Sequence, residues 1–291
     1  MKYFIIFQFL LISIGVFAQS SENYNISLEG HWVVDDNSDA AFQSHGIRIK
    51  LLSKPFQQGK KGTIRVNAIY NYVEINYNEN SELFSDLEHF HSVGFTLGYI
   101  KPFQNPRWTF VGMAIPVLNS NFTGGVSSRD LYINALLLFN YSKQKDTRFT
   151  MGLVYTSTFG YPAPIPVFSY WREWNKKWEM NFGFPKIDLI YHLNPKTSFM
   201  SYCEMQGFNG NISKSIHSPI FEDSRTARRI SYSDILAGLE WQYKLNNLQF
   251  RFNTSYTLYR EFELQNTDYK TAYDFDMGKN FNIGVGIDYK F

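Results

Sequence analysis

The sequence predicts an all-β protein that forms a single closed antiparallel transmembrane β-barrel of about twelve to fourteen strands. Three observations lead to this prediction. Apolar residues recur at every second position along segments of about 10–15 residues, longer than the ~5–6 residues of strands in soluble sheets. Aromatic residues make up 18% of the 291 residues, yet the mean hydropathy is −0.30. Beyond the N-terminal segment, no run of roughly eighteen apolar residues offers a helical span.

The first 18 residues have the features of a cleavable signal peptide. Lys2 precedes an apolar run that ends at Phe17, and the small residue Ala18 precedes Gln19. A retained helical anchor is the alternative, but the run is shorter than the ~20 residues that a spanning helix needs. We therefore expect residues 1–18 to be removed and residues 19–291 to form one barrel domain outside the cytoplasm.

The alternation of apolar and polar residues is clearest in the last segment of the chain. Similar patterns occupy residues 131–141, 235–245 and 250–258. A tilted strand crosses a membrane in ~9–11 residues, with apolar side chains toward lipid and polar ones toward a lumen. In lipid, only a closed barrel pairs every backbone group of a sheet. The apolar side of the last segment consists of Phe281, Ile283, Val285, Ile287, Tyr289 and Phe291.

Short polar turns alternate with longer connections, as expected for a barrel with short periplasmic turns and long extracellular loops. Counting one hairpin between successive short turns gives about fourteen strands. The segment 178–193 is split by Pro185 and short for two crossings, so twelve or even ten strands remain alternatives. The short turns are predicted at 54–62, 104–106, 143–146, 175–176, 194–196 and 246–247, and the long connections at 78–91, 119–129, 211–228 and 263–278.

One long connection contains apolar residues at helical spacing. Leu83, Phe84, Leu87 and Phe90 follow Asn80-Ser81, a suitable N-cap pair. This pattern predicts a short amphipathic helix folded over the rim or into the mouth of the barrel. An ordered loop that buries a few rings is the alternative.

If the apolar faces meet lipid, the opposite faces line the lumen. Their charges either neutralise one another in ladders that support the wall, or they form a polar conduit or binding cavity for a small solute. A ring of about twelve to fourteen strands leaves a lumen that side chains alone do not fill, although loops folded into the mouth would plug it. The lumen-lining candidates are Arg48, Lys50, Arg148, Asp188, His192, Glu240, Lys244, Arg251, Asp288 and Lys290, with Glu29 and His31 also on predicted inner faces.

Several functional classes are disfavoured by the sequence. The 28 Lys and Arg residues are balanced by 26 Asp and Glu residues, which argues against nucleic-acid binding. A single cysteine, Cys203, excludes an internal disulfide and any multi-cysteine metal site. His89 and His91 lack a third fixed ligand, so we expect no metal or cofactor. No Gly-x-Ser-x-Gly motif occurs, and the chain is not expected to be an enzyme; a hydrolase that uses His192 is the weakest alternative.

The cleavable signal, the amphipathic strands and the terminal Phe291 resemble Gram-negative outer-membrane β-barrels. This resemblance implies that the C-terminal strand is read by the barrel-assembly machinery, and that outer-membrane lipid and lipopolysaccharide are partners. The residues that match this assembly signal are Ile283, Val285, Ile287, Tyr289 and Phe291.

A narrower resemblance supports the same assignment. The segment from Pro164 to Tyr191, which includes Tyr170-Trp171 and Gly183-Phe184-Pro185, is similar to a family of outer-membrane barrels of unknown function. It implies no activity. The sequence therefore predicts a passive pore or binding barrel for a small solute, and the alternative is a structural or surface-interaction barrel plugged by its own loops.

Overall fold

The structure is a computed structural model that describes residues 26–34, 40–41, 49–52, 62–77, 81–157, 160–222 and 225–290. The predicted signal peptide at 1–18, Arg48 and Phe291 lie outside the described residues.

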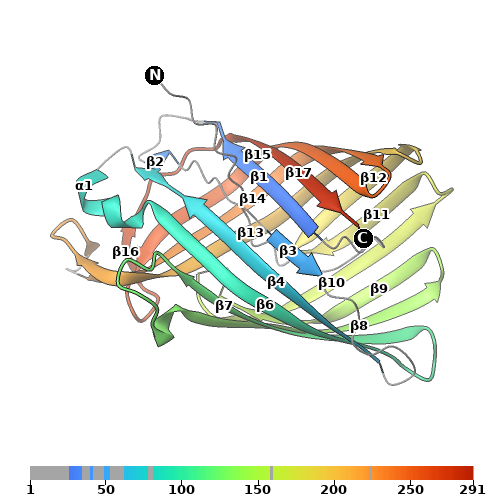
Figure 1. The fold of residues 1–291 in the computed structure, drawn as a ribbon, viewed down its shortest axis with the longest axis horizontal. Coiled ribbons are helices and arrows are strands. Elements are labelled where there is room, and N and C mark those ends of the chain that lie inside the picture. The colour runs from blue at the N-terminus through green and yellow to red at the C-terminus, as the bar shows by residue number, and fades with distance from the viewer. Residues whose placement is uncertain are drawn as a thin grey trace.

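The described residues form a closed antiparallel barrel (Figure 1). Fifteen strands make one sheet, and fourteen of them form a ring in sequence order, because β17 pairs with β1 and β15 pairs with β14. The strands of the ring are β1 (Ile26–Val33), β3 (Ile49–Leu52), β4 (Thr63–Glu74), β6 (His89–Pro102), β7 (Trp108–Ser120), β8 (Leu131–Gln144), β9 (Thr147–Thr156), β10 (Ala163–Trp174), β11 (Trp178–Phe184), β12 (Lys186–Asn194), β13 (Thr197–His217), β14 (Thr226–Leu245), β15 (Leu248–Gln265) and β17 (Phe281–Tyr289).

The remaining elements are short. Strand β16 (Thr271–Asp274) pairs with the C-terminal residues of β15, from Glu263 to Gln265, and β2 (Ala40–Ala41) pairs with β5 (Asn76–Tyr77). The helices are α1 (Ser81–Phe84), η1 (Ser85–Leu87) and η2 (Ser128–Asp130). Among the described residues, no helix is both long and apolar enough to cross a membrane.

The predicted all-β transmembrane barrel is therefore confirmed, and the number of strands in the ring lies at the upper end of the expected range. The doubtful segment 178–193 forms two strands, β11 and β12, both of them in the ring. They are short, with 7 and 9 residues, so the wall is low at this point.

The outer surface of the ring is an apolar belt. On β8 most odd-numbered residues as far as Phe139 are exposed, including Leu137 at 53%, whereas Leu136 and Leu138 on the inner face are only 2% and 3% exposed. On β14, Leu239 is 63% exposed. Side chains of this kind are stable in hydrocarbon, so lipid is the environment that the belt fits.

Large rings lie near the short turns at one end of this belt. Trp178 packs against Tyr191 in a tilted arrangement, with ring centroids 4.6 Å apart, and the Trp108 and Tyr141 rings are 4.9 Å apart. Such amphipathic rings suit the interface between hydrocarbon and water. We call this end of the barrel, where β8–β9, β10–β11, β12–β13 and β14–β15 are joined by short turns, the turn end, and the opposite end the loop end.

Three strands extend well above the rest of the wall, which corrects two sequence expectations. The connection expected at 211–228 is more than half strand, because β13 continues to His217 and β14 begins at Thr226. The connection expected at 263–278 is partly strand, because β15 continues to Gln265 and β16 occupies Thr271–Asp274. A bulge at Leu258 shifts the register of β15, so that even-numbered rather than odd-numbered residues face inward beyond it. Because the inward-facing positions change from odd to even at the bulge, the part of β15 beyond Leu258 does not continue the alternation of the preceding residues, and a search for period two does not detect it as the same strand.

The loop end is filled by an apolar cluster around α1 and η1, which we call the plug. Phe84, Leu87 and Phe90 are 0% exposed, as the predicted helix folded into the mouth requires, although the helix is only one short α-turn followed by a 3₁₀ turn. Figure 1 places α1 beside β16 at the end of the barrel opposite the C-terminus. The plug consists of Val73, Ile75, Tyr77, Phe84, Leu87, Phe90, Phe208, Ile212, Phe221, Ala227, Ile230, Tyr232, Phe262, Leu264 and Phe275.

At the loop end, polar contacts join the long strand β13 to β7, to η2 and to the connection that follows β9, above the shorter strands β8 to β12. A parallel bridge joins Asn211 to Ser120 at the end of β7. Asn211 also donates from Nδ2 to Asp130 Oδ1 at 2.7 Å, and Asn209 Nδ2 donates to the carbonyl oxygen of Gly160 at 3.1 Å. These contacts bring the top of the wall together beside the plug.

A charge placed on the belt should destabilise the barrel in lipid. We expect Leu137→Arg, at the middle of β8, to cost about 2–4 kcal/mol of unfolding free energy in bilayers. The matched control is Val126→Arg, because Val126 is 71% exposed in the connection between β7 and η2 and lies outside the belt. Denaturant unfolding in vesicles measures both variants, and an equal cost for the two would contradict the belt.

Candidate functional site: the charged layer of the lumen

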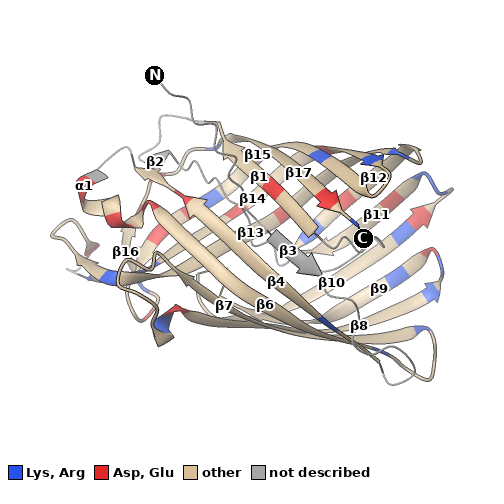
Figure 2. Ribbon diagram, in the orientation of Figure 1, with Lys and Arg blue, Asp and Glu red and all other residues tan. Residues whose placement is uncertain are grey.

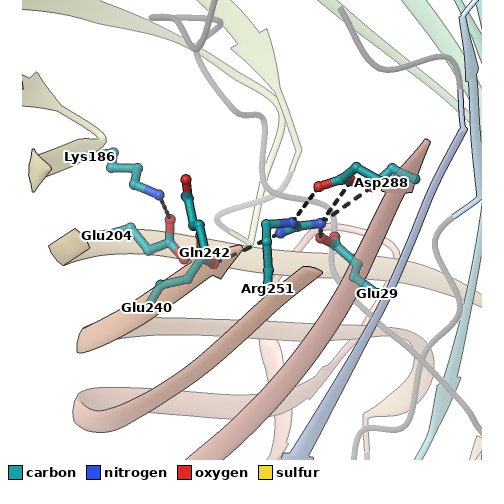
Figure 3. A network of polar contacts seen from close by, with 8 residues as sticks. Glu29, Lys186, Glu204, Glu240, Gln242, Arg251 and Asp288 are labelled. Atoms are coloured by element: carbon teal, nitrogen blue, oxygen red, sulfur yellow. Dashed lines mark hydrogen bonds and ion pairs between the residues drawn. The ribbon is translucent and has the colours of Figure 1, made fainter. Parts of the chain in front are cut away.

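Positively and negatively charged residues are concentrated on the strands of one side of the barrel, whereas β6 and β7 carry few of them (Figure 2). Antiparallel partners share a face of the sheet, so the register on β15 and β17 brings inward-facing residues of neighbouring strands together. Figure 3 shows how most of these residues, Asp188 excepted, converge from different strands. We call them the charged layer, which comprises Glu29 on β1, Lys186 and Asp188 on β12, Glu204 on β13, Glu240 on β14, Arg251 on β15 and Asp288 on β17.

Arg251 is the centre of the charged layer. Its Nε donates to Asp288 Oδ2 at 2.7 Å, and its Nη2 donates to Glu29 Oε2 at 3.0 Å. Its Nη1 lies 3.9 Å from Glu240 Oε2. One guanidinium therefore faces three carboxylates, and the charge-assisted hydrogen bonds to two of them fix its position.

A glycine on the neighbouring strand makes room for this side chain. Gly286 lies opposite Arg251 in the register of β15 and β17. A Cβ added at Gly286 would lie 2.8 Å from Arg251 Nη2. The absence of a side chain at Gly286 is thus what allows the guanidinium to reach Glu29 across β17.

Lys186 is the second cation of the layer. Its Nζ lies 3.1 Å from Glu204 Oε2 and 5.0 Å from the centre of the Tyr202 ring. Asp188 accepts a hydrogen bond from Asn181 Nδ2 at 3.4 Å. The layer therefore holds five carboxylates and two cations, a formal excess of three negative charges.

His192 belongs to a separate hydrogen-bonded chain. Its Nε2 lies 2.7 Å from Glu179 Oε1, and its Nδ1 lies 2.8 Å from Ser198 Oγ. Trp171 Nε1 donates to Glu179 Oε2 at 3.4 Å, and Arg148 lies over the Trp171 ring at 5.0 Å. His192 therefore contacts residues of β11 and β13.

The remaining residues that the sequence predicted to line the lumen differ in their exposure and in how much of them the structure describes. Lys244 and His31 are half-buried on inner faces, whereas Lys290 follows the end of β17 and is exposed. The backbone of Lys50 pairs with Ser27. Arg48 lies outside the described residues.

Sequence reasoning missed Lys186, Glu204, Glu179 and Ser198. Both faces of 199–205 carry apolar residues and Pro185 interrupts the pattern before Lys186, so the parity of these strands is ambiguous in the sequence. Their partners also depend on register, which pairs Lys186 with Glu204 and His192 with Ser198. The even spacing of Lys186, Asp188 and His192, which puts all three on one face of a strand, is the one sequence feature that indicates that Lys186 faces the lumen with the other two.

A polar pair separates the charged layer from the plug. Asp234 and Arg260 are 1% and 8% exposed. Asp234 Oδ2 accepts from the Tyr232 hydroxyl at 2.6 Å, and Arg260 Nη2 donates to Thr257 Oγ1 at 2.9 Å. Along β14, Asp234 lies between Glu240 and the plug residue Ile230, so polarity falls from the turn end to the loop end.

The histidines considered as metal ligands have other partners. Tyr72 hydroxyl and His89 Nδ1 are 2.8 Å apart, and Tyr70 hydroxyl and His91 Nδ1 are 3.0 Å apart. Within the described part of the chain, no group of three or more His, Cys, Asp or Glu side chains is placed to hold a metal ion.

The fold and the lumen together define a class, a fourteen-stranded transmembrane β-barrel with an apolar belt outside and a charged layer inside. The chain belongs to the family described as a domain of unknown function, DUF6268, whose model matches residues 13–290. The narrower resemblance to a barrel family of unknown function is thus confirmed.

Solved barrels give weak overall matches. The NanC porin has a TM-score of 0.40 and 11% identity, covering 91% of this chain and 100% of that chain. The KdgM porin, in complex with disordered oligogalacturonate, has a TM-score of 0.42 and 9% identity over 91% and 98%. The toluene transporter TodX from Pseudomonas putida has a TM-score of 0.35 and 10% identity over 91% and 88%. A comparison with curated protein sequences gave no match.

Removal of the central cation should be costly. We expect Arg251→Ala to lower the unfolding free energy by about 3–5 kcal/mol, because Glu29 and Asp288 would be left buried without a counter-charge. Denaturant unfolding measures the loss. Arg107→Ala, at an exposed position in the turn between β6 and β7, is the control.

The triple variant Glu29→Gln, Arg251→Ala, Asp288→Asn should recover much of that loss. If Arg251→Ala were as stable as the control, the charged layer would not be held by Arg251.

Proposed function

We propose that this barrel is a passive pore of the bacterial outer membrane, which admits small polar solutes through a hydrated lumen. The observation that carries the proposal is the charged layer. Charged and polar groups on an inner wall are favourable when water reaches them, and they are costly in a dry interior. The amide oxygens of Asn181 and Asn253 have no hydrogen-bond partner within the protein, although both residues are buried. Water or a solute would satisfy them.

The proposed location rests on the belt and on the last strand. Ile283 and Ile287 are exposed on the outer face of β17, whereas Asp288 is on the inner face. A C-terminal strand of this pattern would be recognised by the barrel-assembly machinery, and the belt would be solvated by outer-membrane lipid.

Lipopolysaccharide is the partner proposed for the loop end. There, Arg225 already donates to Glu222 and to the carbonyl oxygen of Thr271, and Arg229 lies 4.0 Å from the centre of the Tyr269 ring. These arginines would therefore have to exchange contacts within the loops for contacts with lipid phosphate.

The plug is the proposed gate. A solute moving along the axis would have to pass the apolar side chains of Phe84 and Leu87, which are fully buried. Since α1 and η1 are short and lie in a connection between strands, their displacement would open the loop end. The same burial is the observation that favours the second candidate, a structural barrel that its own loop keeps permanently closed.

Single-channel recording separates these two functions. In planar bilayers we expect discrete conductance steps from the wild type and a higher open probability for the variant Phe84→Ala, Leu87→Ala, which loosens the plug. Phe103→Ala, at an exposed ring of the turn end, is the control and should behave as the wild type. Silence from both the wild type and the loosened variant would contradict the pore and favour the structural barrel.

The chain Ser198–His192–Glu179 is the observation that favours a hydrolase. However, Ser198 is 4% exposed, and His192 presents Nδ1 rather than Nε2 to the serine, the reverse of the usual serine–histidine arrangement. We therefore expect no covalent labelling of the wild type by a fluorophosphonate probe. Labelling that is lost in Ser198→Ala would overturn this expectation and establish a reactive serine.

A further inference from the structure

We propose that the charged layer binds small cations, so that the lumen favours cations over anions. This inference rests on the proposed function and names the class of solute that the same site takes. Monovalent inorganic ions and small amines have the required chemistry, since carboxylate and amide oxygens are ligands for both.

The first argument is the imbalance of charge. Within the charged layer, the five carboxylates of Glu29, Asp188, Glu204, Glu240 and Asp288 outnumber the two cations Lys186 and Arg251. The cations Arg148 and Lys244 lie outside this layer. A wall of low dielectric focuses the potential of such an excess into the lumen, where it attracts ions of the opposite sign.

The second argument is that the two cations are already occupied. Arg251 donates to both Asp288 and Glu29, and Lys186 is paired with Glu204 at 3.1 Å. An anion that entered the layer would have to displace a carboxylate from one of them. An anion in the lumen would therefore be repelled by carboxylates before it could contact either cation.

Two of the carboxylates are weakly neutralised by comparison. The shortest ion pair of Glu240 is 3.9 Å long, and its closest contact is the neutral donor Gln242 at 2.7 Å. Asp188 accepts from Asn181 at 3.4 Å. These two groups are the ones that an incoming cation would approach at the lowest cost.

Unpartnered oxygens beside these two carboxylates provide an independent observation. Asn253 lies opposite Glu240 in the register of β14 and β15, and Asn181 lies opposite Asp188 in that of β11 and β12. Asn253 and Asn181 are 5% and 4% exposed, and the Oδ1 atom of each is without a hydrogen-bond partner in the protein. Each weakly neutralised carboxylate is therefore paired in register with a residue that carries a free acceptor oxygen, and these two kinds of oxygen would be the ligands of a bound cation.

The test compares ion selectivity between isosteric variants. In a KCl gradient across a planar bilayer, the reversal potential of the wild type should indicate preference for K⁺ over Cl⁻. The double variant Asp188→Asn, Glu240→Gln keeps the shape and the ion pairs of Arg251 with Asp288 and Glu29. Removing two charges that lie about 10 Å from a passing ion should lower the K⁺/Cl⁻ permeability ratio on the order of tenfold.

The matched control is Glu261→Gln. Glu261 is exposed near the loop end and accepts from the Tyr259 hydroxyl, so this variant removes a carboxylate outside the layer. Its permeability ratio should equal that of the wild type. A wild-type channel that prefers Cl⁻, or a K⁺/Cl⁻ permeability ratio that the double variant leaves unchanged, would overturn the cation inference. Either result would leave the proposed pore function intact.

A second measurement tests cation binding if the wild type and the loosened variant Phe84→Ala, Leu87→Ala are both silent in bilayers, a result that would overturn the pore. In detergent at low ionic strength, K⁺ should raise the thermal unfolding midpoint of the wild type and of Glu261→Gln, because a cation that binds the native state stabilises it. The double variant should lose this increase. An equal increase in all three proteins would reflect general screening, and no increase would mean no binding, so either result would overturn the inference.

Discussion

The constraint on which the structure depends is the pairing of backbone groups in hydrocarbon. Lipid offers no hydrogen-bond partner, so a sheet placed there is stable only when its first and last strands also pair. In this barrel β1 and β17 are joined over eight residue pairs, from Ile26–Tyr289 to Val33–Asn282. Closure also fixes the two faces of every strand, because alternate side chains must then point to lipid and to the lumen.

The two ends of the lumen are built from different chemistry. Toward the turn end, carboxylates and cations are held by contacts such as Arg251 with Asp288, and glycine at 286 gives them space. Toward the loop end, β13, β14 and β15 extend beyond the low wall and enclose an apolar cluster around α1. A polar interior toward one end and an apolar plug at the other are the two features on which the proposed gated pore rests.

The sequence predicts the features that one strand determines by itself. Residues 281–289 alternate so regularly that their outer and inner faces follow directly, and the apolar spacing around Phe84 predicts a helix in the mouth. Features that depend on register between strands are not predictable in this way. Glu179 meets His192 only because β11 and β12 pair, and the bulge at Leu258 inverts the faces of β15. The strongest interactions of the lumen are therefore the least visible in the sequence.

The central claim is that one face of each strand contacts hydrocarbon while the other is hydrated. It is tested most directly by a nitroxide scan along β17, from 281 to 289, in a Cys203→Ser background reconstituted in bilayers. Collisions with oxygen, which concentrates in lipid, should peak at odd-numbered positions, and collisions with a water-soluble nickel complex should peak at even-numbered ones. Oxygen accessibility that is equal at both sets of positions, or highest at the even-numbered ones, would contradict the account.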